Sequence, residues 1–182
     1  MRCAAYVDGF NLYHFIEFEP QLKWLDIRQL ITSYLLAKDT LERVTYFTAL
    51  AHWKPVSMEQ HRLFLRALES TGVNVQHGKF RKGRKYCPAC KKDIKCRQEK
   101  RTDVNIATAM ISDAYEHRFE KAVLVTGDAD LAPAVELIRF RFPALRVTAL
   151  TPLGRKAREL ESVCNENAQI TSERMERLSL PR

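Results

Sequence analysis

The feature that most constrains the fold of this chain is a regular alternation between short β-branched or aromatic runs and longer segments with helical periodicity. The runs short enough to be strands are residues 2–8, 43–50, 73–80, 122–127 and 146–150. The segments that repeat apolar side chains at helical spacing are residues 26–37, 57–70, 103–117 and 131–142. This alternation predicts an α/β fold with a mostly parallel five-stranded sheet and helices on both faces.

The length of the chain, 182 residues, suits a single domain spanning residues 1–182. Within it we expect a small basic, Cys-rich insertion at residues 81–98 and a C-terminal helical tail at residues 154–182. No apolar run is long enough to span a bilayer, and the first residues do not have the pattern of a signal peptide. The sequence therefore predicts a cytoplasmic protein that does not enter a membrane.

The first predicted strand ends in the stretch "YVDGFNLYH", where Asp8 and Gly9 are followed by Asn11. In an open parallel sheet, ligands bind beyond the carboxyl ends of the strands. Gly9 allows the backbone to turn sharply there, and the Asn11 amide enters the next helical turn, where it can bind or position a ligand. Asp8 and Asn11 are therefore candidate site residues.

Two further segments place carboxylates at the same predicted edge of the sheet. Asp128 and Asp130 follow the strand in "VLVTGDADLAPAV", and Asp103 stands near a helix start in "EKRTDVNIATAM". Several carboxylates close together repel one another unless a cation binds them, and an all-oxygen ligand set suits Mg²⁺ or Mn²⁺. Such an ion can activate water and stabilise the charge that develops during phosphodiester cleavage.

Each of these residues also has a purely structural interpretation. Asp103 and Asp130 could be helix N-caps, and Asp8 and Asn11 could be turn formers. Their joint placement at one predicted edge favours a site over these separate explanations. Asp113 falls on the side of its helix with charged neighbours and is expected to be a solvated charge.

The positive charge of the chain is concentrated in residues 79–101. This segment has eleven Lys or Arg against two carboxylates, a net charge of +9, so the rest of the chain sums to −1. Clustered cations, with Phe80 and Tyr86 available for stacking, favour nucleic-acid binding over a merely solvated basic loop. The candidate nucleic-acid-binding residues are Lys82, Arg84, Lys85, Lys91, Lys92 and Arg97.

The same segment contains "CPACKKDIKC", in which a Cys-x-x-Cys pair is followed by a third cysteine. Cys87, Cys90 and Cys96 could ligate Zn²⁺, with His77 as a fourth ligand if the segment folds back as a ribbon. A second Cys-x-x-Cys pair is missing, so a reduced, metal-free loop is the open alternative.

Three segments, "YVDGFNLYH", "EKRTDVNIATAMISDAY" and "AVLVTGDADLAPAVELI", resemble in their order and spacing the signature segments of the NYN domain family, the LabA/DUF88-like branch of the PIN-like nucleases. The resemblance implies a PIN-like fold and a metal-dependent ribonuclease site. By position, Asp8 and Asn11 match the first family motif. Asp103 matches the aspartate of the central helix, and Asp128 and Asp130 match the acidic pair. Thr126 and Ala129 replace residues that are commonly serine, without removing a carboxylate.

These observations together predict an endoribonuclease that uses Mg²⁺ or Mn²⁺ and binds RNA. The alternative is an RNA-binding regulatory module with weak or no catalysis. A phosphatase of the haloacid dehalogenase type is disfavoured, because its Asp-x-Asp motif ends the first strand, whereas "DAD" here follows the fourth. The RNA substrate, the number of metal ions and the oligomeric state stay open.

Overall fold

The computed structural model describes residues 1–16, 24–152, 157–175 and 178, except for the side chain of Lys85. Its strands are β1 (Arg2–Asp8), β2 (Thr40–Thr48), β3 (Asn74–His77), β4 (Lys79–Cys87), β5 (Lys92–Lys100), β6 (Lys121–Val125), β7 (Arg146–Pro152) and β8 (Glu166–Ile170). Its helices are α1 (Gly9–Ile16), α2 (Ile27–Thr32), α3 (Pro55–Ser70), α4 (Thr102–Tyr115), the 3₁₀ helix η2 (Ala129–Leu131), α5 (Ala132–Arg141), α6 (Arg158–Val163) and α7 (Ser172–Met175).

The main sheet has six parallel strands in the order β3-β2-β1-β6-β7-β8. From β1 to β3, each strand is added on one side of β1. From β6 to β8, each strand is added on the opposite side. The order therefore reverses between β1 and β6, and such a reversal opens a crevice at the carboxyl ends of the two strands. The predicted parallel α/β fold is confirmed, and its binding edge is located.

The sheet has one strand more than the five predicted. Residues 166–170, expected to lie in a helical tail, form the edge strand β8, which pairs in parallel with β7. Only Ile170 is fully buried in this strand, whose sequence "ENAQI" has little β-branched character. The tertiary pairing with β7, rather than local propensity, makes this segment a strand.

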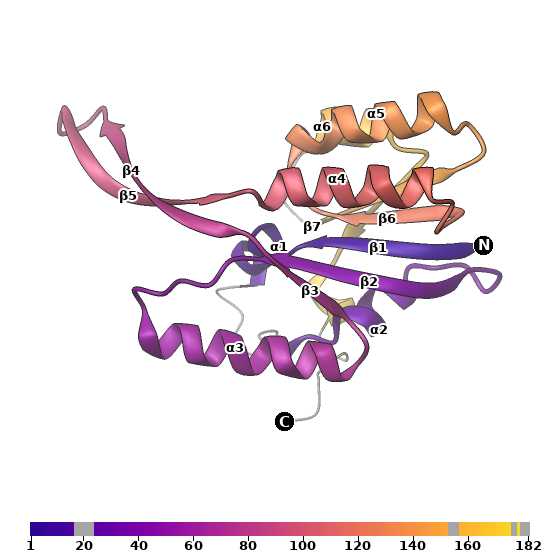
Figure 1. The fold of residues 1–182 in the computed structure, drawn as a ribbon, viewed down its shortest axis with the longest axis horizontal. Coiled ribbons are helices and arrows are strands. Elements are labelled where there is room, and N and C mark those ends of the chain that lie inside the picture. The colour runs from indigo at the N-terminus through magenta and orange to yellow at the C-terminus, as the bar shows by residue number, and fades with distance from the viewer. Residues whose placement is uncertain (17–23, 153–156, 176–177, 179–182) are drawn as a thin grey trace.

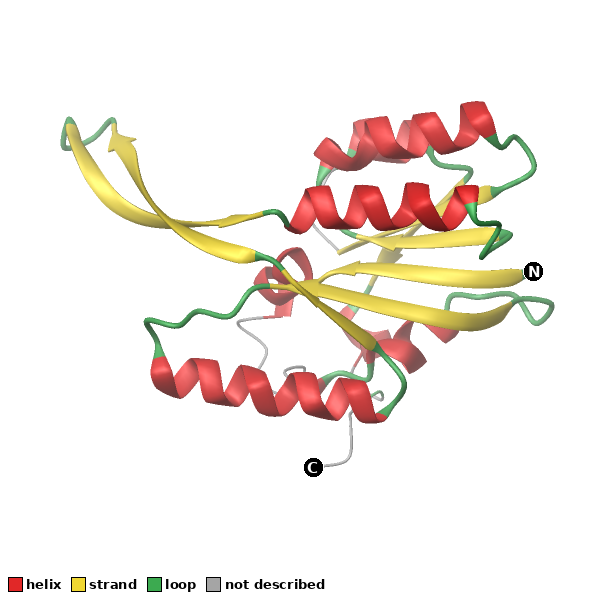
Figure 2. Cartoon of the chain, viewed as in Figure 1, coloured by secondary structure: helices red, strands yellow, loops and turns green. Residues whose placement is uncertain are grey.

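The two faces of the sheet are covered by different helices, as Figures 1 and 2 show. Along β1, Ala5 and Val7 pack into a core with α1, α2 and α3, whereas Ala4 and Tyr6 pack into a core with α4, α5 and α6. This alternation follows from the two-residue period of a strand. In the described part of the chain, no helix is long and apolar enough to cross a membrane.

The basic segment forms an antiparallel hairpin, β4–β5, that projects away from the sheet (Figure 1). Nine residue pairs join its strands, from Lys79–Lys100 to Cys87–Lys92. The predicted strand over residues 73–80 is thus two strands that meet at Gly78, because β3 pairs with β2 and β4 pairs with β5. A Cβ at Gly78 would lie 2.6 Å from the Thr102 hydroxyl, so the small residue lets β3 and β4 pass close to the start of α4.

The prediction that Asp113 is a solvated charge is wrong. Asp113 is buried on α4 and accepts a hydrogen bond of 2.7 Å from the Tyr6 hydroxyl. Arg43 donates to its other oxygen at 3.1 Å, and Arg118 lies 3.6 Å from that same oxygen. Helical periodicity correctly placed charged neighbours beside it, but it could not show that Tyr6 reaches it from the sheet.

Gly9, directly after Asp8, is required by close packing. A Cβ there would lie 2.5 Å from the buried Tyr46 ring and 2.7 Å from the Phe47 carbonyl oxygen. We therefore expect Gly9→Ala to lower the free energy of unfolding by about 1–3 kcal/mol through overpacking, measured by urea denaturation. Gly83→Ala is the matched control, because its nearest contact would be an ordinary 3.5 Å. Equal stability of the two variants would contradict this account.

Candidate active site

The centre of the candidate site is Asp8, which is buried where β1 ends. Its Oδ1 accepts a hydrogen bond of 2.9 Å from the Asn11 backbone N–H, and its Oδ2 accepts one of 3.0 Å from the Thr126 hydroxyl. The first bond caps the start of α1, whereas the structural interpretation of Asp8 was a turn former. The second joins β1 to the loop after β6, so Asp8 connects the two strands on either side of the crevice.

The loop after β6 is organised by hydrogen bonds from backbone N–H groups. Gly127 donates to the Asn11 side-chain oxygen at 2.9 Å, and Asp128 donates to the Thr126 hydroxyl at 3.1 Å. Asp130 donates to Oδ1 of Asp128 at 2.9 Å. Asp128 is thus the N-cap of η2, whereas Asp130 lies within its first turn. The Asn11 side chain therefore joins α1 to the loop after β6.

Asp103 enters the site from the first turn of α4 and is exposed. It is not the N-cap of that helix: the N-cap is Arg101, whose left-handed backbone (φ 79°) turns the chain out of β5. Just before this turn, the half-buried Glu99 accepts a hydrogen bond from the Thr102 hydroxyl. The end of the hairpin therefore adds a carboxylate beside Asp103.

The pKa values show that these carboxylates interact. Burial, with the Asp103 and Asp128 charges, raises the pKa of Asp8 to about 6, although its hydrogen bonds to Asn11 and Thr126 oppose the shift. Burial and the charges of Asp8 and Asp103 raise the pKa of Glu99 to about 7. Burial, Asp128 and Asp130 also raise the pKa of Asp103. Neighbouring negative charges therefore make the ionisation of Asp8, Glu99 and Asp103 harder.

The ligand atoms of this site are of the kind that a hard divalent cation prefers. All the donors are carboxylate oxygens, and their mutual repulsion would be relieved by positive charge. Within the residues that the structure describes, no group of three or more His, Cys, Asp or Glu is spaced to hold a metal ion. Cation binding would therefore involve movement of the carboxylates around Asp8.

Sequence reasoning missed two residues of the site, Glu99 and Thr126. Glu99 was counted only as one of two acidic charges in the basic segment, although it lies four residues before Asp103. Thr126 was noted as a departure from the family pattern, but its buried hydroxyl both donates to Asp8 and accepts from Asp128. The hydroxyl function that a serine would supply is therefore present.

The structure does not bring the four predicted zinc ligands together. Cys96 pairs with Gly83, four residue pairs along the hairpin from Cys87 and therefore about 14 Å away. His77 pairs with Thr48 in the main sheet, at the opposite end of β4 from Cys87. Only Cys87 and Cys90 stay close, and hydrogen bonds from Cys90 and Ala89 lower the pKa of Cys87. The geometry does not support the zinc prediction.

Most of the predicted nucleic-acid-binding residues are exposed on the hairpin. Lys82 and Arg84 lie on β4, Lys91 and Lys92 lie at the tip, and Arg97 lies on β5. The remaining candidate, Lys85, has its backbone in β4, but its side chain is outside the described part of the structure. The hairpin connects through Lys100 and Arg101 to α4, so the Lys100 charge at its base acts on Asp103.

Comparison with known proteins identifies the family of the chain. The sequence pattern of the NYN domain matches residues 2–171, nearly the whole chain. The chain belongs to the NYN domain family. Members of this family are nucleases, and the six-stranded parallel sheet flanked by helices is consistent with a PIN-like NYN fold. Family membership thus supports a nuclease role for this NYN protein.

Two individual proteins are similar to the NYN chain. One is a protein of unknown function from Vibrio parahaemolyticus, whose crystal structure is 19% identical in sequence. The two structures superpose over 94% of each chain with a TM-score of 0.65, which shows a shared fold. The 6-hydroxy-3-succinoylpyridine 3-monooxygenase HspA of Pseudomonas putida is 26% identical over 174 residues, covering 76% of this chain and 56% of HspA. The chain thus spans little more than half of that relative.

The raised pKa of Asp8 predicts how stability changes with pH in the metal-free protein. Because the folded pKa of about 6 exceeds the ordinary 3.8, the folded state binds the proton more tightly than the unfolded state. The stabilisation from this proton is complete below pH 4 and is lost as the pH rises through 6, by about 3 kcal/mol. We expect Asp8→Asn in EDTA to be more stable than the wild type at pH 7.5 but not at pH 4, measured by urea denaturation.

A matched control is Glu136→Gln, which neutralises an exposed carboxylate on α5. Its effect on the free energy of unfolding should stay small at both pH values. If the difference between Asp8→Asn and the wild type were the same at pH 4 and pH 7.5, Asp8 would not titrate as described.

Proposed function

We propose that this NYN protein is an endoribonuclease that hydrolyses RNA phosphodiester bonds with the help of Mg²⁺ or Mn²⁺. The observation that carries the proposal is that the charges of Asp103 and Asp128 act on the buried Asp8 carboxylate at the crevice between β1 and β6 and raise its pKa. Clusters of carboxylates with perturbed pKa values are typical of sites that hold divalent cations or perform acid–base chemistry.

In this proposal Asp8, Asp103 and Asp128 would hold the cation, with Asp130 and Glu99 at the margins of the site. The bound cation would supply Lewis-acid stabilisation of the phosphoryl oxygens and lower the pKa of an attacking water. The metal dependence is also supported by the family, because PIN-like nucleases generally use divalent metals.

The residues of the chain supply positioning. Asp8 is fixed by the Asn11 N–H and the Thr126 hydroxyl, so its carboxylate cannot rotate without breaking a hydrogen bond. Asn11 in turn accepts from Gly127 and keeps the Asp128 loop against α1. Such preorganisation matters because misplacement of a reacting group by about 1 Å can cost about 100-fold in rate.

The basic hairpin supplies affinity for the phosphate backbone. A cluster of carboxylates alone would repel an RNA strand, whereas the net charge of +9 over residues 79–101 attracts it. The hairpin joins the main domain next to Glu99 and Asp103. An RNA strand bound along the hairpin would therefore reach the carboxylates. The same hairpin would serve an RNA-binding module that turns over slowly or not at all, which is the competing function.

Cleavage of a labelled single-stranded RNA tests the proposal. We expect the wild type to cleave it with Mn²⁺ or Mg²⁺, EDTA to abolish cleavage, and Asp128→Asn to lower the rate at least about 100-fold. The substitution keeps the shape of the side chain while removing its charge.

The control for this experiment is Asp93→Asn, which makes the same chemical change on the exposed face of β5. It should retain cleavage within about twofold. Cleavage that is unaffected by EDTA and by Asp128→Asn would refute the assigned site. Salt-dependent RNA binding without any cleavage would favour the competing binding module.

The contribution of the hairpin can be measured by a salt titration. Replacing Arg84, Lys91 and Lys92 by Gln should weaken RNA binding, and should reduce the slope of log affinity against log salt concentration by about 2. The reason is that each lost phosphate contact releases about 0.7 fewer counterions from a single strand.

As a control, Gln is placed instead at Arg62, Arg66 and Arg141, three exposed cations outside the hairpin. This variant has the same net charge as the hairpin variant. If both variants lowered the slope equally, the attraction would come from total charge and not from the hairpin.

A further inference from the structure

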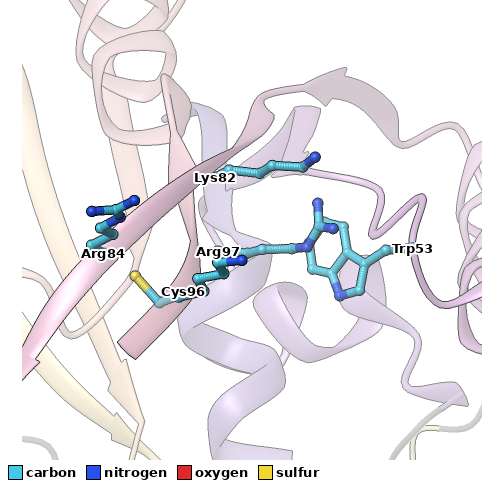
Figure 3. Close-up of a pocket in the computed structure, with 6 residues that line it drawn as sticks. Trp53, Lys82, Arg84, Cys96 and Arg97 are labelled. Atoms are coloured by element: carbon cyan, nitrogen blue, oxygen red, sulfur yellow. The ribbon is translucent and has the colours of Figure 1, made fainter. Parts of the chain in front are cut away.

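A pocket of about 640 Å³ lies along the middle of the hairpin, next to the loop between β2 and α3. Its lining residues are Trp53, Lys82, Arg84, Lys95, Cys96 and Arg97 (Figure 3). Four of these six are cations, and the lining includes no carboxylate. The pocket therefore combines an aromatic surface with a positive field, unlike the acidic crevice.

The aromatic surface is the half-buried indole of Trp53, over which the Arg97 side chain extends (Figure 3). The Arg97 guanidinium lies 4.2 Å from the centre of the Trp53 ring, a cation–π contact. A planar cation on an indole occupies the place and the geometry that a stacked nucleobase would take. The contact also holds the indole against the hairpin before any ligand binds.

Ring contacts connect this pocket to the acidic crevice. Trp53 packs edge-to-face on Phe80, with ring centres 4.8 Å apart, and Phe80 packs on Phe10 at 6.3 Å. Phe10 is 40% exposed and lies two residues after Asp8. A chain of ring contacts therefore runs from the pocket to the partly exposed Phe10, next to Asp8.

We propose that the pocket is a nucleotide subsite, which holds one unit of an RNA strand outside the point of cleavage. The base takes the place of the Arg97 guanidinium on Trp53, while Lys82, Arg84 and Lys95 bind the adjoining phosphate. This inference rests on the proposed function, because it assumes that the strand continues along Phe80 and Phe10 to the carboxylates. The substrate is then single-stranded RNA, since a base in a duplex is already stacked on its neighbours and cannot stack on Trp53.

Tryptophan fluorescence gives a direct test, because the chain has two tryptophans, Trp24 and Trp53. Trp24 packs against Phe64 on α3 and does not line the pocket. In EDTA, to prevent cleavage, we titrate a 12-nucleotide oligoadenylate into Trp24→Phe, which reports Trp53, and into Trp53→Phe, which reports Trp24. We expect quenching in Trp24→Phe and its loss in Trp53→Phe. Quenching that is equal in both variants, or absent from Trp24→Phe, would overturn the subsite.

Affinity provides a second readout. We expect Trp53→Ala to weaken binding of the oligonucleotide about 10-fold, as measured by fluorescence anisotropy of a labelled strand. Phe140→Ala removes an aromatic ring that is 77% exposed on α5, and it should leave the affinity within twofold. Equal losses in the two variants would overturn the proposal. The Trp24→Phe quenching experiment leaves Trp53 unchanged, so it remains decisive if Trp53→Ala does not fold.

Comparing ligands distinguishes a single RNA strand from a duplex and from a free nucleotide, which carry the same bases and phosphates. A 12-base-pair duplex and free AMP should each bind at least about 10-fold more weakly than the single strand. Equal affinity for the duplex would overturn the stacking argument, and equal affinity for AMP would make the pocket a mononucleotide site.

The subsite and the nuclease function can fail separately. Metal-dependent cleavage that Asp128→Asn abolishes, combined with unaltered binding in Trp53→Ala, would refute the subsite and leave the nuclease intact. Stacking on Trp53 without cleavage would refute the nuclease and leave the subsite as part of a binding module.

Discussion

The structure of the site depends on the buried carboxylate of Asp8. Its two oxygens accept hydrogen bonds from the Asn11 N–H and the Thr126 hydroxyl, and so connect the end of β1, the start of α1 and the loop after β6. Burying a carboxylate is costly unless its oxygens are paired, and here the pairing groups come from both sides of the crevice. The same burial, together with neighbouring charges, raises the pKa of Asp8 to about 6. One residue is thus both the structural link at this edge of the sheet and the centre of the proposed site.

Opposite charges are arranged in adjacent regions of the chain. Carboxylates gather at the carboxyl ends of β1 and β6, and eleven cations extend from there along residues 79–101. Glu99, at the end of β5, belongs to both regions, because it is close enough to Asp8 and Asp103 for their charges to raise its pKa to about 7. The hairpin therefore contributes a carboxylate to the acidic crevice, in addition to its positive charges.

The cysteines show how a motif can mislead when the register is unknown. Read as a sequence, "CPACKKDIKC" groups three thiols within ten residues. In the hairpin, Cys96 instead pairs with Gly83 and lines the pocket beside Trp53, while Cys87 and Cys90 lie towards the tip. Successive strand residues advance by about 3.4 Å, so a few positions in the register decide whether two side chains can share a ligand.

The sequence by itself determined the parallel α/β architecture, the carboxylates at strand ends, and the concentration of positive charge between residues 79 and 101. These features follow from local periodicity and from the rule that parallel strands end at one edge. Only the tertiary structure decided that β8 joins the sheet, that Tyr6 buries Asp113, that Glu99 faces the carboxylates, and that Trp53 meets Arg97. Each of these depends on contacts between segments distant in sequence, and such contacts are set by strand order, register and packing rather than by any local pattern.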